Sequence, residues 1–199
     1  SVNSSFTPMR VYHTALITWF DGRIDDAEAQ FQLMLESGVS SRGVEAYGAF
    51  LENQDRSDEA AALYENFLAV APDDEIIGAA LAAHQGGGTA APMIADVAAG
   101  LAEAFEGMAA ELTQENALNP ARNFAQLALY LRPDLEPAMM ALANTMEQEE
   151  LWDLANEVLA NVQLDSPYSW AARMRTAVNL GRMDDVDGAA AILEGMANE

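Results

Sequence analysis

The sequence predicts an all-α fold, a right-handed α-α superhelix built from helical hairpins. Two observations predict it. Similar residues recur 34 positions apart in the second half of the chain, and apolar residues follow helical spacing while hardly any segment alternates like a strand. Hairpins in such a repeat bury their apolar faces against neighbouring hairpins. The recurring pairs are Met108 and Leu142, Ala109 and Ala143, Leu112 and Met146, Ala121 and Ala155, Ala128 and Val162, and Pro133 and Pro167.

The first half of the chain predicts two hairpins. The first spans about residues 8–40, with its turn at 21–23, and the second spans about 41–74, with its turn at 55–57. Corresponding residues such as Phe31 and Tyr64 are 33 positions apart, which indicates one deletion in a turn. Pro72 ends the second hairpin because proline cannot continue a helix. A short apolar helix is predicted over 76–84.

A glycine-rich segment divides the chain into the predicted blocks. Three consecutive glycines at 86–88 cost too much backbone entropy for a helix, so we expect a hinge loop over 86–92. The N-terminal block is then 1–85, two hairpins and a short helix, and the C-terminal block is 93–199. The flanking helices could instead hold this loop rigid. A phosphate-binding loop is excluded because such a loop needs a lysine, and the sequence contains none.

The C-terminal block predicts three hairpins. The first pairs helices over 93–112 and 121–131, and the second pairs 136–146 with 151–162. The last pairs 168–180 with 185–196 around a turn at Gly181 and Arg182. Gly181 stands only four positions after Ala177, where the repeat expects about seven. We therefore expect an irregular last hairpin that lacks one helical turn.

The residues at these spacings resemble the tetratricopeptide repeat (TPR) family over nearly the whole chain. Residues 126–133 and 165–170 further resemble an internal part of larger exported TPR proteins of alphaproteobacteria. That resemblance implies a longer natural protein acting outside the cytoplasm, although a cytoplasmic location stays open. The resemblance assigns repeat packing to Gly48, Ala60, Tyr64, Pro72, Ala109, Ala121, Pro133, Ala143, Ala155 and Pro167.

Composition limits the classes of function. The 199 residues include 32 acidic and nine basic side chains, all nine arginine, for a formal net charge of −23. This charge repels phosphate backbones and anionic lipids, so we expect no nucleic-acid or membrane-surface partner. The absence of cysteine excludes disulfides and thiolate sites. No apolar run approaches the length of a membrane span.

No motif predicts catalysis, a cofactor or a metal site. Asp185, Asp187, Gly188 and Glu194 follow the spacing of a calcium loop, but Met183 stands at its first position, and a thioether is a poor calcium ligand. These acids are better explained as helix starters. Neither histidine has a second ligand at the spacing of a metal site. We therefore expect a protein without enzymatic activity and without a cofactor.

The resemblance implies a ligand groove lined by the first helix of each hairpin. Its candidates would make the groove acidic and polar, so we expect a protein or peptide partner with an extended basic or neutral segment. TPR domains that clamp a carboxylate use lysines at such positions, and this chain has none. The groove candidates are Arg42, Glu45, Glu52, Asn53, Glu103, Glu106, Gln114, Met140, Asn144 and Glu147.

Three alternatives stay open. The carboxylates could only keep the array soluble. The chain could be a structural or assembly module whose apolar end helices stack on further repeats or on a second copy. It could also be a regulatory or ligand-binding domain of an enzyme complex, with a pocket lined by Tyr130, Trp152 and Trp170, although core packing better explains these rings. Arg175 and the other arginines of the last hairpin are expected to pair with Asp184 or Asp185.

Overall fold

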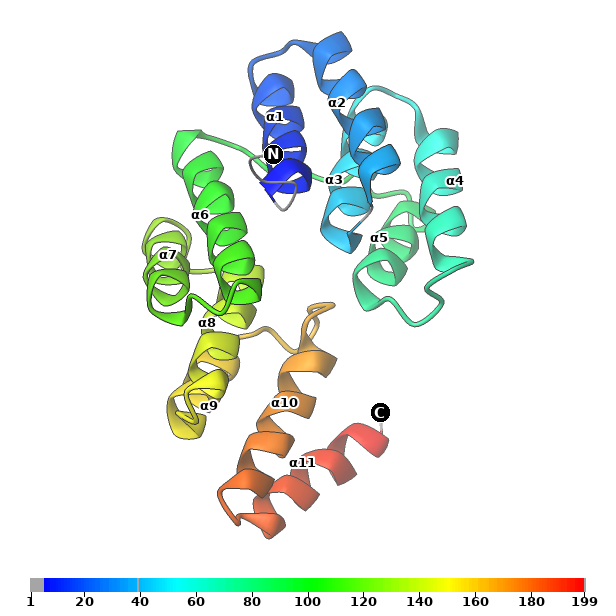
Figure 1. The fold of residues 1–199 in the computed structure, drawn as a ribbon. Coiled ribbons are helices and arrows are strands. Elements are labelled where there is room, and N and C mark those ends of the chain that lie inside the picture. Colours follow the sequence, from blue (N-terminus) through cyan, green and yellow to red (C-terminus); the bar gives the residue numbers. More distant parts are fainter. Residues whose placement is uncertain (1–5, 39, 199) are drawn as a thin grey trace. The chain divides into compact units, whose positions relative to one another are not determined.

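The computed structural model describes residues 6–38 and 40–198, and within these ranges it contains eleven α-helices and no strand (Figure 1). The prediction of an all-α fold is confirmed. The chain forms two compact units, Ser1–Gly100 and Leu101–Glu199. No helix of the described residues is both long and apolar enough to cross a membrane.

The first unit contains two complete hairpins and a single further helix. Helices α1 and α2 form one hairpin, and α3 and α4 form the next, with α5 packed against both α3 and α4. The bounds are α1 Phe6–Phe20, α2 Ile24–Ser37, α3 Ser41–Asn53, α4 Ser57–Leu68 and α5 Glu75–Gln85.

The second unit contains three hairpins, α6 with α7, α8 with α9, and α10 with α11. Helix α6 begins within the first unit, three residues before its last residue, Gly100. The bounds are α6 Val97–Gln114, α7 Leu118–Leu131, α8 Glu136–Gln148, α9 Trp152–Leu159, α10 Ser169–Arg182 and α11 Val186–Ala197.

All five hairpins turn in the same way. One residue between the two helices has a positive φ, and a backbone N–H just beyond it bonds to the carbonyl five residues earlier, as in a Schellman motif. For example, Glu150 has φ 62°, and Leu151 N donates to Met146 O at 2.9 Å. The left-handed residues are Gly22, Asp55, Asn116, Glu150 and Asp184. This repeated turn sets the register of every hairpin.

The last hairpin keeps the repeat, which corrects the prediction of a missing helical turn. Asp184 lies 34 residues after Glu150, and α10 has 14 residues against 13 in α8. Gly181 and Arg182 belong to α10, and the turn follows at 183–185. The glycine misled the sequence analysis because an aspartate, not a glycine, occupies the left-handed position.

The glycine-rich segment begins as a helix end of the same kind. Gly87 has φ 80°, and Gly88 N donates to Ala83 O at 3.0 Å, so α5 closes as the first helix of a hairpin does. No second helix follows, and residues 89–96 lead to α6. Two side chains of α3 bind this segment at Ala90: Glu52 accepts from its N–H at 2.6 Å, and Asn53 donates to its carbonyl at 2.7 Å. The segment lies inside the first unit, and a moving hinge there stays a prediction.

The core of the first unit is aromatic. Phe31 of α2 stacks on Tyr47 of α3 with ring centroids 5.1 Å apart, and Phe50 lies 5.2 Å from Phe31. Trp19 of α1 meets Phe50 edge to face at 5.5 Å. These offset and edge contacts are the preferred geometries of aromatic pairs, and they join three successive helices into one core.

Alanine dominates the core of the second unit. Small side chains let helices approach closely, and adding bulk to such contacts is destabilising. Some of the buried alanines belong to three of the residue pairs predicted to recur 34 positions apart. Phe105 and Phe124, with ring centroids 5.8 Å apart, add bulk between α6 and α7. The fully buried alanines are Ala102, Ala109, Ala121, Ala125, Ala128, Ala138, Ala143 and Ala155.

The residues predicted to pack the repeats fall into two groups. Gly48, Ala60, Tyr64, Ala109, Ala121, Ala143 and Ala155 are buried. Pro72, Pro133 and Pro167 are exposed or half-buried in the connections after α4, α7 and α9. We propose that the first group packs helices together and that the prolines end them.

Gly48→Ala is expected to destabilise the chain by about 3 kcal/mol. A Cβ at Gly48 would lie 2.1 Å from the Tyr64 hydroxyl oxygen and 2.2 Å from two ring carbons, and Tyr64 is 1% exposed. Gly78→Ala in α5 is the control, because nothing lies within 4 Å of its Cβ. It should stabilise by about 0.5–1 kcal/mol through helix propensity. Equal midpoints of urea unfolding for the two variants would contradict this packing.

Glu150→Gly is expected to stabilise the chain by about 1 kcal/mol, because a left-handed residue other than glycine is strained. Ala62→Gly, at an exposed position within α4, should instead cost about 1 kcal/mol. Chemical denaturation of both variants measures the difference. A loss of stability in both would contradict the role of the turn.

Candidate functional site

The predicted groove positions of α3 make contacts within the first unit. Arg42 pairs with Glu45 at 3.1 Å, one helical turn away, and both side chains are only partly exposed. Glu52 is 7% exposed, and its carboxylate lies 3.0 Å from His84 Nδ1 of α5. Asn53 is exposed but binds Ala90 and its own helix. On this helix, Glu45 pairs within its own helix, and Glu52 makes contacts that hold the unit together.

Glu52 is the centre of a buried polar cluster. It accepts from the backbone of Ala90, and the Tyr64 hydroxyl of α4 donates to it at 3.4 Å. Burial, and then the charge of Glu52, raise the pKa of Tyr64 above its ordinary value. The cluster joins α3, α4, α5 and the glycine-rich segment. The sequence analysis missed it because its members are 12 to 38 residues apart.

The predicted groove positions of α6 differ in exposure. The Glu103 side chain is fully buried and lies 3.4 Å from Arg132, which follows α7. Glu106 is half-buried, whereas Gln114 at the end of α6 is exposed. Because a charge at 0% exposure cannot meet a ligand, Glu103 supports its own unit rather than a groove.

The groove positions of α8 are joined to α10 by one arginine. Arg175 of α10 binds both carboxylate oxygens of Glu147, at 2.9–3.2 Å, and donates to the carbonyl of Met140 at 3.1 Å. Asn179 donates to Glu147 at 2.9 Å. Such a two-pronged contact fixes geometry as well as charge. Asn144 is half-buried on the same helix and accepts from Gln148 at 3.3 Å.

The contacts of Arg175 and Arg182 correct the pairing expected for these two arginines of the last hairpin. Arg175 pairs with Glu147 of the preceding hairpin, not with the acids of its own turn. Arg182 lies over the ring of Trp152 in α9, 4.5 Å from its centroid. The sequence analysis considered only nearby carboxylates, while the repeat brings α10 against α8 and α9.

Helix α10 exposes a stripe of apolar side chains, two of which, Met174 and Val178, stand at groove positions. Trp170 is 55% exposed and Val178 is 47% exposed, with half-buried Met174 between them at helical spacing. Met174 and Val178 stand 34 residues after Met140 and Asn144, so the two pairs occupy the same face of successive hairpins. We call the residues Met140, Asn144, Trp170, Met174 and Val178 the α8–α10 face.

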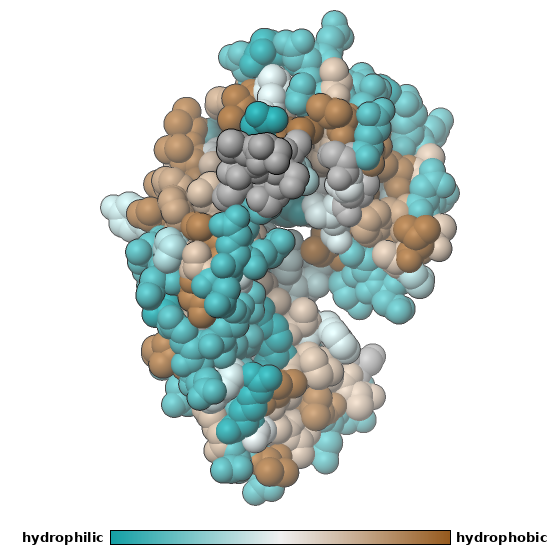
Figure 2. Space-filling view, viewed as in Figure 1, coloured by the Kyte–Doolittle hydropathy of each residue, from teal (hydrophilic) through white to brown (hydrophobic). Residues whose placement is uncertain are grey.

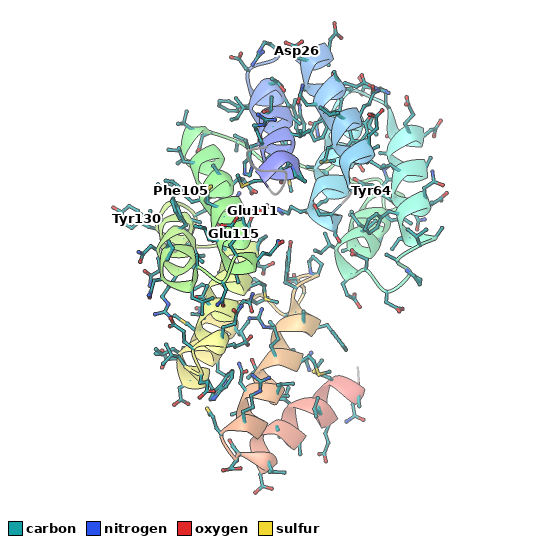
Figure 3. The ribbon with its side chains drawn as sticks, in the orientation of Figure 1. Asp26, Tyr64, Phe105, Glu111, Glu115 and Tyr130 are labelled. Atoms are coloured by element: carbon teal, nitrogen blue, oxygen red, sulfur yellow. The ribbon has the colours of Figure 1, made fainter. Side chains whose placement is uncertain are left out.

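Two aromatic residues expected in the core lie at the surface. Trp170 belongs to the α8–α10 face, and Tyr130 of α7 is 83% exposed and points away from its helix (Figure 3). Helical spacing alone could not exclude a core position for either residue. Trp152 is half-buried beneath Arg182, as a partly packed ring.

One cavity of about 290 Å³ lies between α9, α10 and α11. This volume is at the lower end for small-molecule sites. None of the three rings proposed as pocket liners borders it. Its lining includes Leu159, Val162, Leu164, Ala172, Arg173 and Ile192.

The acidic loop before α11 acts as a helix cap. The Asp185 side chain accepts from Gly188 N at 3.0 Å, as an N-cap residue does. Within the described ranges, no group of three or more histidine or acidic side chains is placed to hold a metal ion.

Glu111 and Glu115 lie one turn apart near the end of α6 (Figure 3). Partial burial, and then the charge of Glu115, raise the pKa of Glu111. The pair is therefore a local site of charge repulsion.

No family model matches this chain, and no curated protein matches it. Several solved structures are similar to it, including these two. A mutant of MamA is 12% identical, with a TM-score of 0.42, over 96% of each chain. A thermophilic TPR protein of Thermus thermophilus is 13% identical, with a TM-score of 0.36, over 94% of this chain and 88% of that chain. The TPR-like hairpins described above rest on this chain's own repeated turns and helix contacts.

Glu111→Gln is expected to stabilise the chain at neutral pH by about 0.5 kcal/mol, the size of a like-charge helix pair. The folded state holds the Glu111 proton more tightly than the unfolded state, so this residue lowers stability as pH rises through its raised pKa. At about pH 3 both states are protonated and the gain should vanish. Urea unfolding at both pH values measures it.

Glu65→Gln is the matched control, because no acid lies three or four residues from Glu65. The control should change stability little at either pH. An equal gain for both variants, or a gain at Glu111 that persists in acid, would contradict the assignment.

Proposed function

We propose that this chain is a non-catalytic protein-interaction scaffold that binds an extended, neutral or basic segment of another protein. The observation that carries the proposal is the α8–α10 face. It combines the exposed side chains of Trp170 and Val178 with half-buried Met140, Asn144 and Met174, and four of these five residues stand at positions where the TPR resemblance implies a ligand groove.

The residue types of this face suit peptide binding. Tryptophan is enriched among the residues that dominate binding energy, and methionine adapts its shape to different partners. The Asn144 amide can both donate to and accept from the backbone of an extended segment. Beside them, the contact of Arg175 with Glu147 holds α10 against α8, which keeps the two halves of the face in one arrangement.

Charge favours a neutral or basic segment over an acidic one. The net charge of −23 repels anionic partners over distances up to about 8–10 Å. The carboxylates at groove positions contribute less than their number indicates, because Glu52 and Glu103 are buried and Glu45 and Glu147 pair with arginines. We therefore infer that apolar contacts supply the affinity and that the charge selects among partners.

An assembly role is the second candidate. Exposed apolar side chains at α1 and α11 favour it, and their positions are specific enough to carry the separate inference below. The cavity between α9, α10 and α11 favours a ligand-binding role less, because its volume of about 290 Å³ is at the lower end for small-molecule sites.

Selection of short random peptides displayed on phage tests the scaffold proposal. Neutral or basic peptides with apolar residues should be enriched, and Val178→Asp should weaken their binding at least about tenfold. Leu127→Asp on α7 is the control, since Leu127 is 45% exposed but lies off the α8–α10 face. It should bind as the unmodified chain does. Acidic peptides, or peptides insensitive to Val178→Asp, would contradict the proposal.

A further inference from the structure

Helices α2, α4, α7 and α9 are second helices of hairpins, and each presents one face to the next helix along the chain. The first, fifth and eighth residues of the helix form this face. The eighth residues of α2, α4, α7 and α9 are at most 3% exposed. They are Phe31, Tyr64, Ala125 and Leu159.

In each case, the following helix buries this residue. Phe31 packs on Phe50 of α3, and Tyr64 meets His84 of α5 edge to face at 6.4 Å. Ala125 shares a cluster with Leu142 of α8, and Leu159 shares one with Ala172 of α10. The helix pairs α2–α3, α4–α5, α7–α8 and α9–α10 are therefore one kind of junction.

Polar side chains complete the α9–α10 junction. Asn179 donates to the fifth residue of α9, Asn156, at 2.9 Å, and Arg182 lies over the first, Trp152. The start of α9 thus meets the end of α10. The α10 side of this junction consists of Ala172, Asn179 and Arg182. These residues stand 12, 5 and 2 positions before the left-handed Asp184.

Helix α11 has the same face, and none of the described residues buries it. Its first, fifth and eighth residues are Val186, Ala190 and Leu193, which we call the α11 face. Val186 is 68% exposed and Leu193 is 42% exposed, and no residue of α11 is buried. Figure 2 shows apolar side chains, coloured brown, over the α10 and α11 end of the second unit.

Helix α1 has the opposite half of the junction, also uncovered. Counting back 12, 5 and 2 residues from the left-handed Gly22 gives Arg10, Ile17 and Phe20, which we call the α1 face. Ile17 is 55% exposed and Phe20 is 49% exposed, whereas Asn179, at the position of Ile17, is 1% exposed.

We propose that a second copy of this chain covers the α11 face with its α1 face, head to tail, in the geometry of the α9–α10 junction. That register pairs Val186 with Phe20 and Ala190 with Ile17, so apolar pairs stand where the α9–α10 junction has Trp152 with Arg182 and Asn156 with Asn179. Leu193, which directly precedes Glu194 in the sequence, then lies beside the aliphatic stem of Arg10.

Charge also matches the two faces. Helix α11 carries Asp187 and Glu194 and no basic side chain, while α1 carries Arg10 and no carboxylate. A helix without carboxylates suits this face in a chain with 32 acidic residues. Because the two faces differ, the contact is heterologous, so each added copy leaves one face of each kind free.

Sedimentation velocity over a range of protein concentrations, at about 0.15 M salt, tests this inference. The unmodified chain should form species larger than dimers as its concentration rises. Ile17→Glu and Leu193→Glu should each weaken association at least about tenfold. Because both side chains are exposed, both variants should keep the helical circular dichroism of the unmodified chain.

Mixing the two variants gives the decisive result. Ile17→Glu keeps its α11 face and Leu193→Glu keeps its α1 face, so an equal mixture should form heterodimers and nothing larger. Leu127→Glu is the control and should assemble as the unmodified chain does. A monomer at every concentration would overturn the proposal and leave these faces to another protein. Association that persists in either variant, or a mixture that stays monomeric, would also overturn it.

Discussion

The structure depends on one constraint: no hairpin can bury the outer face of its own second helix. That face is covered by the next helix along the chain, as α3 covers Phe31 and α10 covers Leu159. A buried side chain of this size is worth roughly 1.5–3 kcal/mol relative to its exposed state. Each junction therefore adds stability that neither neighbour has alone, which is the physical basis of a repeat array.

The repeated turn makes these junctions regular. A left-handed residue and a bond back to the preceding helix end the first helix at the same point in all five hairpins. The second helix then starts at a constant distance from the turn, so its first, fifth and eighth residues always present the same face. Four of the five left-handed residues are Asp, Asn or Glu rather than glycine. Local backbone strain at these four positions therefore accompanies junctions that are in register.

Acidic residues serve two different purposes in this chain. Some are structural: Glu52 joins three helices and the glycine-rich segment, and Glu147 joins α8 to α10. Others, including Glu65 and Asp153, are exposed on the helices and give the surface its charge. The structural carboxylates occupy positions predicted to line a groove, so the α8–α10 face that we propose for a partner is more apolar than the sequence indicates.

The sequence by itself determined the all-α class and the positions of most turns, because helical periodicity and turn residues are local properties of the chain. Only the tertiary structure decided which side chains are available. Glu52 and Glu103 are buried beside His84 and Arg132, so they are not available to line a groove. Trp170 and Tyr130 are exposed at the surface. These outcomes depend on contacts between residues far apart in the chain. A repeat places equivalent side chains on equivalent faces, but the exposure of each face depends on which helix packs against it. The spacing of residues along the sequence does not identify that helix.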